Sequence, residues 1–81
     1  MRVSLLYFAS VREKLGRERD DLELPAGASV HDLVRAAQVL RPGLTPFDPS
    51  IRIARNLEFT ADNALLKEGD EIAFIPPVSG G

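Results

Sequence analysis

The two most apolar segments of this chain lie at its opposite ends, and this separation restricts how the chain can fold. Residues 2–8 read RVSLLYF and residues 71–75 read EIAFI, and the alternation in both segments predicts β-strands. Both strands have apolar residues on their two faces, which is typical of strands at the centre of a sheet. We therefore expect these two strands to lie side by side, with the remaining segments placed around them.

The segments between these strands predict further elements. Residues 9–16 have helical spacing, residues 20–25 and 51–55 alternate as strands, and residues 57–60 form a short strand at most. A capping box at Ser29–Asp32 opens a longer helix, which ends at the sequence RPG that follows residue 40. The apolar stripe of this main helix is predicted to contain Val30, Leu33, Val34, Ala37 and Leu40.

The order of these elements predicts the fold. A mixed sheet packed on one main helix, with parallel first and last strands, is the β-grasp or ubiquitin-like arrangement of the α+β class. The length of 81 residues leaves room for one small core. We therefore expect a single domain over residues 1–81, with a flexible C-terminal tail at residues 76–81.

Composition argues against several function classes. The chain has no cysteine and a single histidine, His31, so we expect neither disulfides nor a metal site. Its net charge of −2 comes without a basic stripe, which argues against nucleic acid as a partner. The sequence has no apolar run long enough to span a membrane and no recognisable signal peptide, so we expect no membrane association and a cytoplasmic location.

The last six residues, PPVSGG, suit a tail that enters another protein. Pro76 and Pro77 fix φ at about −65° and favour extended backbone, so they direct the tail away from the sheet. Val78 and Ser79 follow, and Gly80 and Gly81 lack a Cβ atom, which leaves the terminal acyl carbon open to close approach. Six extended residues span about 20 Å, which is sufficient to reach a buried active site in a partner.

Strand alternation also predicts a docking surface. The residues of the two terminal strands that face the main helix should be Val3, Leu5, Tyr7, Ile72 and Phe74. The residues between them should form one apolar patch on the opposite face, near the start of the tail, and these are Leu6, Phe8, Ala73 and Ile75. Exposed apolar patches often mark partner sites, so we predict an interface at Phe8, Phe59 and Ile75. The alternative is that a loop or the short helix at 9–16 covers Phe8 and Ile75.

Two stretches make these expectations more specific. YFASVREKLG (7–16) and GDEIAFIPPVSGG (69–81) resemble the small subunits of molybdopterin synthase, a family of ubiquitin-like sulfur carriers. The resemblance covers about half of the chain, and residues 17–50 match only in the order of their elements. At 54–56 the chain reads ARN, where that family is closer to AVN.

The resemblance implies a carrier whose C-terminal carboxylate is the working group. An adenylating enzyme of the ubiquitin-activating kind would activate Gly81 with ATP, and a sulfur donor protein would provide the sulfur for a thiocarboxylate. The large synthase subunit, in a heterotetramer with this chain, would use that sulfur on cyclic pyranopterin monophosphate in molybdenum cofactor biosynthesis. The chain itself would bind no cofactor and supply no catalytic side chain, which makes it a substrate-carrying subunit.

Three alternatives stay open on these residues. One is a sulfur carrier for thiamine synthesis or for tRNA thiolation. Another is a ubiquitin-like protein modifier, joined through Gly81 to lysines of other proteins. The third is a β-grasp binding module whose tail is inert. The double proline before the glycines favours the molybdopterin assignment over the thiamine carrier.

Overall fold

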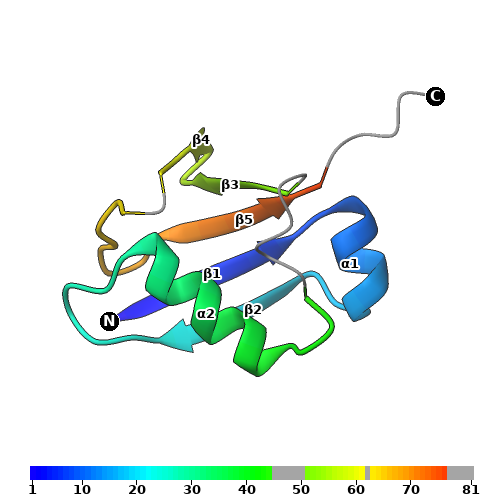
Figure 1. Ribbon diagram of the computed structural model, residues 1–81, viewed down its shortest axis with the longest axis horizontal. Coiled ribbons are helices and arrows are strands. Elements are labelled where there is room, and N and C mark those ends of the chain that lie inside the picture. Colours follow the sequence, from blue (N-terminus) through cyan, green and yellow to red (C-terminus); the bar gives the residue numbers. More distant parts are fainter. Residues whose placement is uncertain (45–50, 62, 77–81) are drawn as a thin grey trace.

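In the computed structural model, which describes residues 1–44, 51–61 and 63–76, two strand–helix pairs are followed by three strands (Figure 1). In chain order the elements are β1 (Arg2–Tyr7), α1 (Ala9–Leu15), β2 (Arg19–Glu23), α2 (Val30–Leu40), β3 (Arg52–Arg55), β4 (Glu58–Phe59) and β5 (Glu71–Ile75). The strands form one mixed sheet in the order β2-β1-β5-β3-β4. Within the described residues, neither helix is long and apolar enough to cross a membrane.

β1 and β5 are parallel neighbours inside this sheet, whereas the other strand pairs are antiparallel. Leu5 pairs with Ile72 and Tyr7 pairs with Phe74, so the two apolar end segments meet as the sequence predicts. The main helix α2 lies across one face of the sheet (Figure 1). The predicted β-grasp fold is therefore confirmed.

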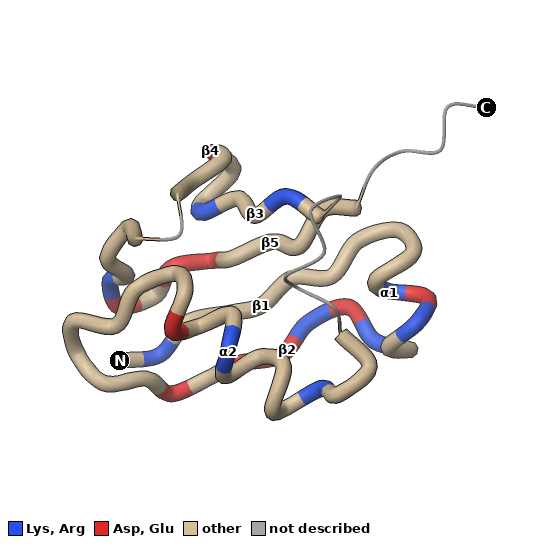
Figure 2. Tube along the Cα trace, in the orientation of Figure 1, with Lys and Arg blue, Asp and Glu red and all other residues tan. Residues whose placement is uncertain are grey.

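Charged residues are absent from most of the two central strands (Figure 2). Beyond Arg2 in β1 and Glu71 in β5, both strands consist of uncharged residues. The edge strand β2, by contrast, has charges of both signs along its length. Charges on an edge strand disfavour pairing with another chain, whereas the central strands are paired on both of their edges.

The capping box predicted at the start of α2 is present. The Asp32 N–H donates a hydrogen bond to Ser29 Oγ at 3.2 Å, and the Ser29 N–H donates to Asp32 Oδ2 at 2.9 Å. Two N–H groups that the helix leaves without carbonyl partners are thereby satisfied. Four of the predicted stripe residues are buried against the sheet, namely Val30, Leu33, Val34 and Ala37.

The prediction that Leu40 belongs to this stripe is wrong, because Leu40 is 39% exposed. Residues four apart share a helix face, so the position that follows Ala37 toward the core is Arg41. Its guanidinium donates two hydrogen bonds to the buried carboxylate of Asp20. An arginine at the end of the helix therefore takes the place that the periodicity assigned to leucine.

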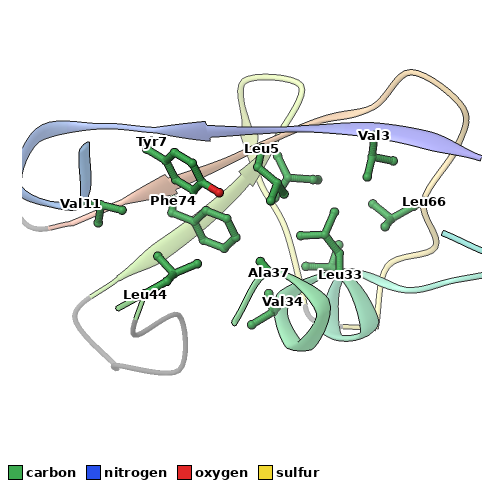
Figure 3. Packing of buried hydrophobic residues seen from close by; sticks show 12 residues of the cluster. Val3, Leu5, Tyr7, Val11, Leu33, Val34, Ala37, Leu44, Leu66 and Phe74 are labelled. Atoms are coloured by element: carbon green, nitrogen blue, oxygen red, sulfur yellow. The ribbon is translucent and has the colours of Figure 1, made fainter. Parts of the chain in front are cut away.

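The core lies between α2 and the face of β1 and β5 that points toward it (Figure 3). The rings of Tyr7 and Phe74 stack with their centroids 6.1 Å apart. Leu44, which follows α2 outside any periodic segment, is buried in the same cluster. All residues predicted to face the helix from the two strands are buried: Val3, Leu5, Tyr7, Ile72 and Phe74.

Element boundaries differ slightly from the prediction. β2 spans Arg19–Glu23 instead of 20–25, although the Leu24 N–H still donates to the Met1 carbonyl at 2.8 Å. Helix α1 ends at Gly16, the predicted stop, whose φ of 70° is a conformation that favours glycine. These differences leave the order and the faces of the strands unchanged.

Candidate functional site

The outer face of the sheet, opposite α2, has an apolar groove. Strand pairing places Leu6 beside Ala73, Ala73 beside Ala54, and Ala54 beside Phe59. These four residues form a cross-strand row over β1, β5, β3 and β4. Leu6 and Ala73 were predicted to face outward from the alternation of their strands, and the pairing confirms that they share one face.

The groove has a volume of about 150 Å³ and is lined by the cross-strand row and residues on either side of it: Leu6, Phe8, Ala54, Leu57, Phe59, Glu71, Ala73 and Ile75. The structure thus brings together the three residues predicted as an interface, Phe8, Phe59 and Ile75. Phe8 and Phe59 are 44% and 57% exposed. The alternative in which α1 covers Phe8 is wrong, because this helix begins after Phe8 and leaves its ring partly in solvent. A partner role for the groove stays a prediction.

The turn between β3 and β4 supplies a lining residue that the sequence analysis missed. Leu57 is 96% exposed, and it has a φ of 75° next to Asn56 with a φ of 50°. Two positive φ values are typical of the two-residue turns that join hairpin strands. Asparagine is common in such turns and leucine is not, because a branched side chain crowds the left-handed backbone. The asparagine between two strand segments was the available signal for this turn.

Hydrogen bonds attach this hairpin to the start of β5. The Asn56 side chain donates to Asp70 Oδ1 at 3.0 Å and accepts from the Glu71 N–H at 2.9 Å. The Asn56 N–H donates to the Glu71 carbonyl at 2.9 Å. Asp70 is buried and also accepts from the Lys67 N–H at 2.8 Å. The wall of the groove formed by Leu57 and Phe59 is therefore anchored in the free chain.

An arginine lies over the aromatic ring of this wall. The Arg52 guanidinium is placed over the Phe59 ring, 3.7 Å from its centroid, which is a cation–π contact. Arg52 pairs with Ile75 in the sheet, so it lies at the end of the groove from which the chain continues toward residue 81. The contact orients the Phe59 ring and puts a positive charge at this end.

The predicted tail starts beside the same end of the groove. Ile75 is the last residue of β5, and Pro76 is buried, so the first residue of the predicted tail is packed into the domain. The other tail residues lie outside the described residues, and so does the predicted role of Gly81 as the reacting residue; these are Pro77, Val78, Ser79, Gly80 and Gly81.

A buried carboxylate lies on the core side of β2. Asp20 is 8% exposed and accepts hydrogen bonds from the Tyr7 hydroxyl at 2.8 Å and from the Arg41 guanidinium at 2.8 and 2.9 Å. Arg17 lies 3.0 Å from the same carboxylate. The hydrogen bonds from Arg41 and Tyr7 hold the pKa of Asp20 below its ordinary value, and burial raises the pKa of the Tyr7 hydroxyl. This Asp20 cluster is satisfied within the chain, which indicates a structural role.

Comparison with known protein sequences identifies the family of this chain. The model of the ThiS family matches residues 5–81. The molybdopterin synthase sulfur carrier subunit of Chlamydomonas reinhardtii is 39% identical over 83 residues, and the match covers 100% of both chains. Both matches include the residues that line the groove and the PPVSGG sequence that follows it.

Solved structures agree with this result. The small archaeal modifier protein 1 of Haloferax volcanii is 29% identical and has a TM-score of 0.91 over 100% of both chains. A chain in the complex of subunits 1 and 2 of the molybdopterin-converting factor of Helicobacter pylori is 28% identical, with a TM-score of 0.73 over 100% of both chains. The chain therefore belongs to the ThiS family, and the relatives that it resembles in sequence include sulfur carrier subunits of molybdopterin synthase.

Proposed function

We propose that this chain is the sulfur carrier subunit of a molybdopterin synthase. The observation that supports the proposal most directly is the position of the groove, which reaches Ile75, after which the chain continues into PPVSGG. The groove, which can bind a partner, is thus adjacent to the start of the tail that can enter the active site of that partner. The relative of this name that matches the full chain supports the same assignment.

The working group in this proposal is the carboxylate of Gly81. An adenylating enzyme joins it to AMP from ATP and releases pyrophosphate, which makes the acyl carbon electrophilic. Sulfur supplied by a donor protein at the sulfide level then attacks this carbon, AMP leaves, and a thiocarboxylate forms. Gly80 and Gly81 leave this carbon accessible because neither residue has a Cβ atom. The thiocarboxylate finally donates its sulfur to cyclic pyranopterin monophosphate, and water restores the carboxylate of Gly81 as the bond between its acyl carbon and the sulfur breaks.

The large subunit of the synthase is the proposed partner of the groove, in a heterotetramer with this chain. Aromatic residues at the centre of an interface are frequent anchors, and Phe8 and Phe59 are the aromatic side chains among the described residues that line the groove. The five residues after Pro76 span at most roughly 18 Å when extended, so the active site of the large subunit must open close to the groove. The two-subunit complex of the Helicobacter pylori relative supports such an assembly.

Mass spectrometry of the intact protein tests the chemistry. After incubation with the adenylating enzyme, ATP and a sulfur source, the mass should rise by the difference between one sulfur atom and one oxygen atom. Deletion of Gly81, or addition of one residue after it, should remove the mass change and the transfer of sulfur to the pterin precursor. Thermal melts are the control, since neither change should unfold the domain. A Gly81 deletion that still supports molybdopterin formation would contradict the proposal.

Protein modification is the second candidate, because the chain is so similar in structure to the small archaeal modifier protein 1. The adenylated Gly81 would then form an isopeptide bond with a lysine amine and release AMP. Incubation of the activated chain with a cell extract distinguishes the two functions. Covalent conjugates that form without the large subunit favour modification, and sulfur transfer that requires the large subunit favours the carrier. Thiolated tRNA or a thiamine precursor as the product would instead favour one of the other carrier alternatives.

A further inference from the structure

We propose that the groove is a socket for one bulky apolar side chain of the large subunit. The inference rests on the proposed function for the identity of the partner. The size and the apolar character of the inserted side chain are inferred from the shape of the cross-strand row. It assigns to Ala54 and Ala73 the role of setting the size of the socket.

The cross-strand row has its large residues at the ends and its small residues in the middle. Leu6 on β1 and Phe59 on β4 flank Ala73 on β5 and Ala54 on β3. Because neighbouring strands lie about 4.8 Å apart, the backbone positions of Leu6 and Phe59 are separated by roughly 14 Å. Side chains rise at both ends of this distance, and only two methyl groups rise between them. The row therefore forms a depression instead of a flat surface.

The depression has the size and polarity of a single apolar side chain. Its volume of about 150 Å³ is that of a protein cavity which holds one benzene molecule. Among the described residues that line it, Glu71, at the end of β5 remote from Pro76, is the one with an ionisable side chain. A phenylalanine or leucine side chain fits such a site, whereas a charged side chain would lose its hydration there.

Leu57 at the rim gives independent support. Its side chain is almost fully exposed, and its backbone has a positive φ that glycine or asparagine adopts more easily. Strained residues of this kind tend to occur at functional sites. A side chain inserted into the socket would contact Leu57 and bury it, which offsets its exposure.

The walls of the socket are held in place in the free chain. The Arg52 guanidinium stacks on Phe59, and Asn56 attaches the hairpin to Asp70. A preformed site loses little conformational freedom when a partner binds. Since Ile75 also lines the socket, a partner that receives the residues after Pro76 also covers the socket.

Filling the socket tests the inference. In Ala73→Leu the larger side chain points into the depression, which is open in the isolated chain, so the fold should be retained. Its Kd for the large subunit should rise about tenfold to a hundredfold, because overfilling a closely packed site is unfavourable. Ala26→Leu is the matched control, since Ala26 is an exposed alanine in the turn before α2 and lies outside the groove. Its Kd should equal that of the wild type.

A small aromatic probe gives a second readout that needs no partner. Toluene is titrated into the protein while the methyl signals are followed by NMR. The methyl signals of Leu6, Ala54 and Ala73 should shift, whereas those of Val39, which is exposed on α2, should not. The Ala73→Leu variant should lose the response of Leu6 and Ala54.

The outcomes separate the socket from the proposed function. An Ala73→Leu variant that binds the large subunit as tightly as the wild type overturns the inference and leaves the carrier function intact. Failure of the wild type to bind the large subunit contradicts the proposed function itself. If the wild type dimerises and Ala73→Leu removes only the dimer, the occupant is a second copy and the inference is wrong. If Ala73→Leu does not fold, the toluene titration of the wild type decides, and shifts spread evenly over the protein count against the socket.

Discussion

The groove on the outer face and the Asp20 cluster depart from the usual distribution of residues in opposite directions. In the groove, Phe8, Leu57 and Phe59 expose apolar side chains, whereas Asp20 buries a carboxylate on the core side of the same sheet. Charged groups are rarely buried without partners, and contiguous apolar surface is rarely left exposed. Each region therefore requires a physical explanation.

The two departures are compensated in different ways. Tyr7 and Arg41 give Asp20 hydrogen bonds from within the chain. In the groove, by contrast, two residues are unfavourable for the local structure. Phe8 occupies the N-cap position of α1, where polar residues are preferred, and Leu57 has a positive φ. The comparison indicates that the Asp20 cluster stabilises the fold and that the groove is kept for binding.

Removal of Asp20 should give the largest effect, and it should change stability alone. Asp20→Ala leaves the Tyr7 hydroxyl and the Arg41 guanidinium without their shared acceptor, so the free energy of unfolding should fall by about 3 kcal/mol. Urea denaturation measures this loss. Asp21→Ala is the control, because Asp21 is half exposed in the same strand, and its effect should be much smaller. An unchanged urea midpoint for Asp20→Ala would contradict a structural role.

Replacement of Phe8 should weaken binding and leave stability unchanged or slightly higher, which is the reverse of the effect expected for Asp20. Phe8→Asp removes an aromatic anchor, so binding of the large subunit should weaken by at least about 2 kcal/mol. The same change provides a good capping residue for α1, so the free energy of unfolding should stay constant or rise by up to about 1 kcal/mol. Calorimetry of binding and urea denaturation measure the two quantities. Val39→Asp, on the exposed surface of α2, is the control for binding. Co-purification of Phe8→Asp with the large subunit would place the interface elsewhere.

Acid should weaken the Asp20 cluster by less than its removal does, because a protonated carboxyl group still accepts hydrogen bonds. The hydrogen bonds from Arg41 and Tyr7 lower the pKa of Asp20 in the folded chain below its unfolded value. At low pH the unfolded chain therefore binds more protons than the folded chain. Stability is complete above about pH 4, the ordinary range for aspartate, and falls as the pH drops through the folded pKa.

Urea midpoints measured at a series of pH values below neutrality check this dependence. Asp20→Ala should lose part of it. The remainder is expected from Asp21 and Asp32, because a hydrogen bond from Ser4 lowers the pKa of Asp21 and the Ser29 N–H lowers the pKa of Asp32. The same pH dependence in Asp20→Ala and in the wild type would show that Asp20 makes no contribution.

Leu57→Gly should have the smallest principal effect of these changes, and its effect on stability should be favourable. Glycine adopts a φ near 75° without strain, so the free energy of unfolding should rise by about 0.5–1 kcal/mol. Leu57→Ala retains the strained backbone and should not gain this stability. Both variants lose a side chain at the rim of the groove and should bind the large subunit more weakly. Equal melting temperatures for the two variants would show that the backbone at this position is not strained.

The fold was predictable because its signals are local. Alternation marked residues 2–8 and 71–75 as central strands, and the capping box at Ser29–Asp32 located the start of α2. The prediction failed at Leu40, where periodicity continued a stripe that the structure ends at Ala37. The partner that makes Arg41 the better core-facing residue is Asp20, which lies 21 residues away in the chain. No helical pattern contains that information.

The residues of the candidate site also fall into two groups, those that the sequence predicted and those that only the tertiary structure revealed. The sequence by itself determined that Leu6, Phe8, Ala73 and Ile75 face away from the core, because side chains alternate along a strand with a period of two. Only the tertiary structure decided that Ala54 and Leu57 complete the groove and that two alanines meet at its centre. The pairing of β5 with β1 and with β3 brings these residues together, and residue patterns within each segment do not specify which of these segments, distant in the chain, will pair.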